Sequence, residues 1–76
     1  IAVNNGNLDK AIELLETAKT MIPDDPQMLY NLSGAYGLKK EFERAQKVLD
    51  ELKKIDPDFP GVKSWQQQLN NVRANK

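Results

Sequence analysis

The feature that most constrains the fold of this chain is that it overlays on itself after a shift of 34 residues. Identical residues meet in the pairs Ala11 and Ala45, Leu15 and Leu49, Lys19 and Lys53, Pro23 and Pro57, and Asp24 and Asp58. Residues of similar type meet in the pairs Leu8 and Phe42, Asp9 and Glu43, Lys10 and Arg44, and Met21 and Ile55. Self-similarity at such a period is typical of proteins in which one small structural unit is repeated and stacked.

Each unit is expected to consist of helices, because apolar residues recur at steps of three and four and no strand pattern is evident. The expected helices are Leu8 to Ile22, Pro26 to Leu38, Glu41 to Ile55 and Gly61 to Ala74. Pro23 and Pro57 end two of them, since the residue before a proline is disfavoured in the α conformation. Asp25 and Pro26 suit the start of a helix. The cluster Asn4–Asn7 is expected to form a turn, with Asn7 as a helix cap.

Residues 25–59 resemble the tetratricopeptide repeat, whose pattern is W-x2-L-G-x2-Y, then A-x3-F, then P. The matching residues are Leu29, Leu32, Ser33 and Tyr36 on the first helix, and Ala45, Leu49 and Pro57 on or after the second. The resemblance implies an all-α fold of antiparallel helix hairpins stacked as a right-handed α-solenoid. The pentatricopeptide family, whose members read RNA, fits less well in period and charge.

On this resemblance, residues 1–76 form one domain in three parts. Residues 1–25 are a partial repeat, mainly its second helix, residues 26–59 are a full repeat, and residues 60–76 are a C-terminal capping helix. Lys40 stands where Gly6 stands in the preceding unit, at a turn that often needs positive φ. A left-handed lysine there would be strained by about 1–2 kcal/mol.

The resemblance also implies a function, which is binding a peptide or another protein in a concave groove lined by the first helices. The implied groove residues are Gln27, Tyr30, Asn31, Gly34, Gly37 and Leu38. Some members bind the acidic tail of heat-shock chaperones through a clamp to which Asn31 corresponds. Gly61 and Trp65 stand where that clamp has its basic residues, so this partner is not expected.

Two features of these helices allow more than one interpretation. Gly34 and Gly37 either permit close helix packing or keep the floor of a groove open. Trp65 is interpreted as a core anchor rather than as a stacking platform.

Composition argues against most other functions. The chain has 11 basic and 11 acidic residues, so it lacks the positive charge that drives nucleic-acid binding. It has no Cys and no His, which removes Ser–His and Cys–His catalysis and the commonest metal ligand. No apolar run reaches the roughly 20 residues that span a bilayer. We therefore expect no enzyme, cofactor, metal or membrane insertion, and a soluble protein for which the cytoplasm is only slightly favoured.

An alternative function is self-assembly through the expected first helix. Its apolar face, with Ala11, Leu14, Ala18 and Leu15, lacks the neighbour that the first helix of its repeat would supply. The chain is therefore expected either to be the C-terminal end of a longer solenoid or to pair with a second copy. Residues 1–25 carry five acids and two lysines, whereas residues 60–76 carry three basic residues and no acid. This asymmetry would favour a head-to-tail or antiparallel contact.

Overall fold

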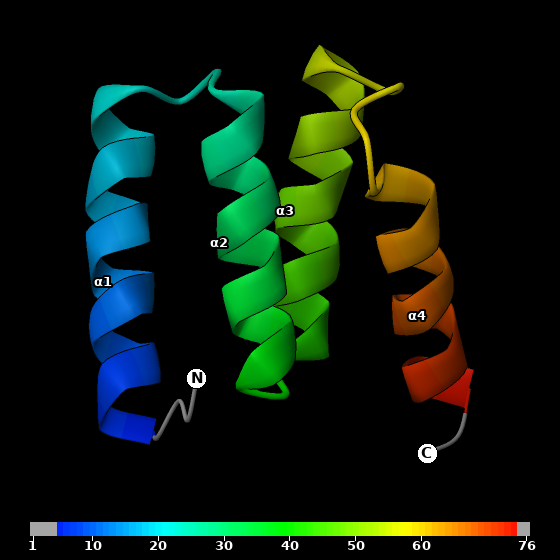
Figure 1. Cartoon of the computed structure of the whole chain (residues 1–76), viewed down its shortest axis with the longest axis horizontal. Helices are drawn as coiled ribbons and strands as arrows, with labels where there is room; N and C mark the ends of the chain where they lie inside the picture. Colours follow the sequence, from blue (N-terminus) through cyan, green and yellow to red (C-terminus); the bar gives the residue numbers. More distant parts are fainter. Residues whose placement is uncertain (1–4, 75–76) are drawn as a thin grey trace.

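The computed structural model describes residues 5–74, and these residues form four helices. The helices are α1 (Asn5–Met21), α2 (Pro26–Leu38), α3 (Phe42–Ile55) and α4 (Val62–Ala74). Consecutive helices run in opposite directions and are joined by short turns, and α3 lies behind α2 in the view of Figure 1. The expected all-α architecture of sequential antiparallel hairpins is confirmed.

The start of α2 follows the predicted capping. Asp25 has extended backbone angles, and its side chain accepts a hydrogen bond of 3.1 Å from the Gln27 backbone N–H. This bond satisfies one of the amides that a helix start leaves without a partner, and Pro26 lacks an amide hydrogen altogether.

The predicted turn at Asn4–Asn7 is wrong over its described part, because α1 begins at Asn5 and Asn7 lies inside the helix. Asn4 lies outside the described residues. Contacts of the next two residues explain why this segment is helical and not a turn. Leu8 is buried, and Asp9 forms an ion pair with Lys39, beyond the end of α2. Packing that holds the first turns of α1 in place favours helix over the local turn preference of asparagine and glycine.

The core is centred on the hairpin of α2 and α3. The seven residues predicted to hold these helices together are Leu29, Leu32, Tyr36, Phe42, Ala45, Leu49 and Leu52, and all are buried except Phe42, which is half-buried. Ser33 is the one buried polar residue among those described. Its hydroxyl donates a 2.7 Å hydrogen bond to the Ala45 backbone carbonyl, so it brings α2 close to α3 without an unpaired polar atom.

The turn between α2 and α3 contains a left-handed lysine, the case for which backbone strain was expected. Lys40 has a φ of 67° and closes the end of α2. The Lys40 amide donates to the Gly37 carbonyl at 3.0 Å, and the Glu41 amide donates to the Tyr36 carbonyl at 2.9 Å. This pair of bonds is the Schellman motif, in which the left-handed position is usually glycine.

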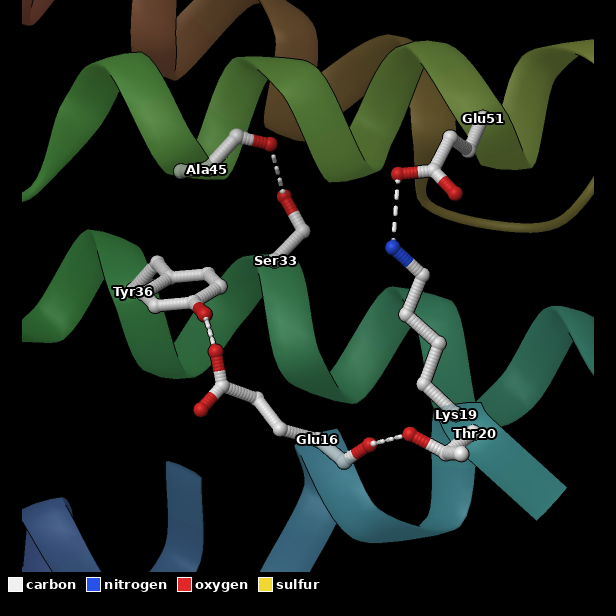
Figure 2. A network of polar contacts seen from close by, with 7 residues as sticks. All are labelled: Glu16, Lys19, Thr20, Ser33, Tyr36, Ala45 and Glu51. Atoms are coloured by element: carbon white, nitrogen blue, oxygen red, sulfur yellow. Dashed lines mark hydrogen bonds and ion pairs between the residues drawn. The ribbon is translucent and has the colours of Figure 1, made fainter. Parts of the chain in front are cut away.

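Polar contacts attach α1 to the hairpin (Figure 2). The Tyr36 hydroxyl donates to the Glu16 carboxylate, and Lys19 forms a 2.9 Å ion pair with Glu51 on α3. At the other end of the molecule, α4 packs on α3 and α2 and buries Val62 and Leu69. The central hairpin therefore has one helix on each side.

Candidate protein-binding groove

A hollow of about 700 Å³ opens on the face shared by α1, α2 and α4, and its lining is mostly apolar. The residues that line it include Leu8 and Ala11 from α1, Tyr30, Asn31, Gly34, Gly37 and Leu38 from α2, and Trp65, Gln68 and Val72 from α4. Lys40 and Phe42 complete it near the turn between α2 and α3. We call this hollow the groove. Its size is within the range of ligand-binding clefts, and its mixture of apolar walls with a few polar groups is typical of them.

The structure brings five of the six predicted groove residues together around this hollow. The sixth, Gln27, does not line it. Its side chain is exposed and donates a 3.2 Å hydrogen bond to the side-chain oxygen Oδ1 of Asn31, one turn further along α2. Gln27 therefore does not contact the groove itself, but its hydrogen bond orients the side-chain amide of Asn31, which does line the groove.

The two glycines of α2 have different roles. A Cβ atom at Gly37 would overlap the indole ring of Trp65, so this glycine permits close packing of α2 against α4. A Cβ atom at Gly34 would meet nothing within 4 Å. Of the two interpretations left open by the sequence, Gly37 thus fits close packing, and Gly34 fits an open groove floor.

Trp65 has a double role that its sequence position did not reveal. It is half-buried, and its indole N–H donates a 2.7 Å hydrogen bond to the Ser33 hydroxyl. The same side chain packs against the core and lines the groove. The prediction of a core anchor described only the inner part of this side chain.

The groove residues from α1 and α4 were not predicted to line a groove. The spacing of Val62, Trp65, Leu69 and Val72 gave the apolar side of α4, but it did not distinguish the buried residues from the exposed ones. Val72 is 41% exposed, whereas Leu69 is fully buried. Only the position of α4 beside α2 determines that Leu69 is buried and Val72 is exposed.

Tyr30, which lines the groove from α2, also lies close to the segment that precedes α4. Tyr30 packs against Phe59, with ring centroids 5.4 Å apart. Gly61 has a φ of 94°, and a Cβ atom there would lie 2.6 Å from the Tyr30 hydroxyl oxygen. Glycine is therefore required for both backbone conformation and space, and it lets the chain pass Tyr30 before α4 begins.

The charge in the groove is small. Lys40 is its one cationic lining residue, and none of the ion pairs found in residues 5–74 includes it. The other polar lining groups are the amides of Asn31 and Gln68 and the Tyr30 hydroxyl. Such a surface is suited to an uncharged or apolar segment, with room for one acidic group near Lys40.

The residues proposed for self-association lie mainly outside the groove. Ala11, Leu15 and Ala18 are half-buried, and Leu14 is 67% exposed. Of the four, only Ala11 also lines the groove.

No group of three or more His, Cys, Asp or Glu side chains in residues 5–74 could hold a metal ion, and no helix there is long and apolar enough to cross a membrane. Among residues 5–74, the one group with a large shift in pKa is Tyr36, whose pKa is raised to about 12 by burial and by its hydrogen bond to the Glu16 carboxylate. This hydroxyl joins α1 to α2 and is not among the groove residues.

Stacked antiparallel helix hairpins with a repeated sequence unit define the class of helical-repeat proteins. Within that class, a family model described as tetratricopeptide repeat matches residues 2–69, and the chain belongs to this family. Its members are generally protein–protein interaction modules and are typically non-catalytic. No match was found among curated proteins, and none among solved structures.

Proposed function

We propose that this chain binds a peptide segment of another protein in the groove between α1, α2 and α4. The observation that carries the proposal is the apolar hollow of about 700 Å³, whose floor is open at Gly34. Desolvation of apolar walls supplies affinity, and the few amides and Lys40 give the bound segment its orientation. Membership of a family of interaction modules supports the same function.

Trp65 makes the proposal testable without knowledge of the natural partner. It is the only tryptophan of the chain and lines the groove, so its fluorescence reports occupancy directly. Peptides selected from a random library for binding to the intact chain are the probes. Titration of a selected peptide is expected to change Trp65 fluorescence in a saturable way.

Gly34→Glu is the matched variant, because the added side chain has space and glutamate favours helix over glycine. It places bulk and charge on the groove floor and is expected to weaken peptide binding at least about tenfold. Gln67→Glu, on an exposed position of α4, is the control and should bind as the natural chain does. Selected peptides that leave Trp65 fluorescence unchanged, or that bind Gly34→Glu equally well, would contradict the proposal.

A further inference from the structure

One side of α1 carries an apolar stripe whose two large residues, Leu14 and Met21, are exposed, whereas its two alanines are half-buried. Ala11, Leu14, Ala18 and Met21 follow one another at steps of three, four and three, which is a heptad spacing. Leu14 is 67% exposed and Met21 is 76% exposed. Neighbouring Ile22 is 57% exposed, and no charged side chain of α1 falls on this arc of the helix. Exposed apolar side chains gathered in this way mark an interaction surface.

This stripe borders the side of α1 that contacts the hairpin. Ala18 packs against the edge of the core and Ala11 lines the groove, whereas Leu14 and Met21 are exposed. Glu16 and Lys19 leave α1 toward α2 and α3, as Figure 2 shows. At roughly 100° per residue, Leu14 lies about 160° around the helix from Glu16. α1 is also at the edge of the molecule in Figure 1, so in residues 5–74 no other helix covers this flank.

We propose that the stripe is covered by α1 of a second copy of this chain, with the two helices antiparallel around a two-fold axis near Glu16 and Thr17. In this register Ala11 faces Met21 of the other copy, and Leu14 faces Ala18. Each layer of the contact then joins one small residue with one large residue. Small residues let two helices approach closely, and a large residue opposite each of them fills the space that remains.

The charges at the ends of α1 match the same register. Lys10 flanks the stripe at its beginning, and Asp24 follows in the turn after its end. Antiparallel pairing brings Lys10 of each copy toward Asp24 of the other, whereas parallel pairing would place like charges together. Opposed helix dipoles also favour the antiparallel arrangement.

The outward side of α4 is a poor alternative occupant. Gln67, Asn70 and Asn71 are exposed there, and burying their amides without partners would oppose association. The head-to-tail contact that the terminal charges would allow is therefore disfavoured against pairing of two α1 helices.

The dimer should be reversible, because stable protein interfaces bury about 1,200–2,000 Å² in total and one pair of short helices provides less.

The first experiment is light scattering over about a hundredfold range of concentration, with helix content followed by circular dichroism. The apparent mass should rise from 8.6 kDa toward about twice that value. Leu14→Glu should raise the dissociation constant at least about tenfold, and Gln67→Glu should leave it unchanged. A mass of 8.6 kDa at every concentration, or a dimer unaffected by Leu14→Glu, overturns the proposal.

Cross-linking decides the orientation, and the absence of Cys makes any introduced thiol unique. Thr17→Cys places the two thiols beside the two-fold axis, so a short bifunctional maleimide should join the copies. Lys10→Cys lies on the same flank two turns earlier, where antiparallel pairing separates the thiols by about 18 Å along the helices. The same maleimide should therefore not cross-link two copies of Lys10→Cys. Efficient cross-linking of Lys10→Cys overturns the antiparallel register. Ala11 belongs to both surfaces, but the dimer is measured by mass and cross-linking and peptide binding by Trp65 fluorescence, so the two proposals can fail independently.

Discussion

Leu49 is fully buried in the core of the α2–α3 hairpin and occupies a position that is leucine in both units of the repeat. Leu49→Ala is expected to lower the free energy of unfolding by about 2–5 kcal/mol, because it removes buried apolar surface and leaves a cavity. A domain of this size has little more stability than that in total. Thermal unfolding checks it, with exposed Gln67→Ala as the control. Equal thermal midpoints for the two variants would show that Leu49 is not a core residue.

Lys40 shows the opposite case, a residue whose backbone is strained in the folded state. Its φ of 67° costs a lysine about 1–2 kcal/mol. Glycine would avoid this strain, but part of the gain would be offset because glycine has more conformational freedom in the unfolded chain. Lys40→Gly should therefore raise the free energy of unfolding by about 0.5–1 kcal/mol in a denaturant titration. Lys40→Ala removes the same charge without relieving the backbone, so it should give no such gain. Equal stability of the two variants would argue against strain at this turn.

At the scale of elements, the attachment of α1 to α2 depends in part on the protonated hydroxyl of Tyr36. Its pKa is raised from 10.0 to about 12, first by burial and then by the hydrogen bond to Glu16. A raised pKa in the folded state means that this stabilisation is complete below pH 10 and is lost as the pH rises through about 12.

The difference in unfolding free energy between the natural chain and Tyr36→Phe should therefore shrink as the pH rises through this window. Chemical unfolding at a series of pH values measures it. Because both proteins share the same lysines, the comparison removes their titration. A difference that stays constant over the window would mean that the Tyr36 hydroxyl has no special environment.

Ser33 connects three helices through one hydroxyl. It donates to the Ala45 carbonyl on α3 and accepts from the Trp65 indole on α4. Ser33→Ala and Trp65→Phe should therefore be coupled, by about 1 kcal/mol in a double-mutant cycle of unfolding free energies. Ser33→Ala combined with Gln67→Ala is the control and should be additive. Additive effects of Ser33→Ala and Trp65→Phe would mean that the indole bond does not contribute to stability.

At the scale of the whole molecule, stability should fall from the central hairpin toward the two outer helices. The fully buried leucines are Leu29 and Leu32 on α2, Leu49 and Leu52 on α3, and Leu69 on α4. In a repeat protein each unit is stabilised by its neighbours, so helices with a neighbour on only one side open more easily.

Hydrogen exchange of the backbone amides should therefore be slowest in α2 and α3 and faster in α1 and α4. It should be measured at low protein concentration, where pairing of α1 between copies is minimal. At high concentration the amides of α1 should become selectively more protected, and Leu14→Glu should abolish that gain. Uniform protection across all four helices would show instead that the molecule opens as a single unit.

The sequence by itself determined the local features of this protein. The steps of three and four, together with Asp25, Pro26 and the prolines after α1 and α3, predicted four helices whose ends agree with the structure to within a few residues. The 34-residue overlay predicted the core of the central hairpin, and it placed Lys40 at a turn that often needs positive φ, where the structure shows a φ of 67°. These features depend on backbone sterics and on the period of the helix, which residues close in sequence determine.

The family resemblance implied the groove residues of α2, but the walls that α1 and α4 contribute were decided only by the tertiary structure. The walls of the groove come from three helices, and the distances between those helices depend on how Gly37 meets Trp65 and how Gly61 passes Tyr30. Helical spacing showed which side of α4 is apolar, but it did not show that Val72 faces open space while Leu69 is buried. The same holds for the first turn of α1, where contacts with α2 prevail over a local preference for a turn. In each case the outcome depends on packing between segments distant in the sequence, which no local pattern records.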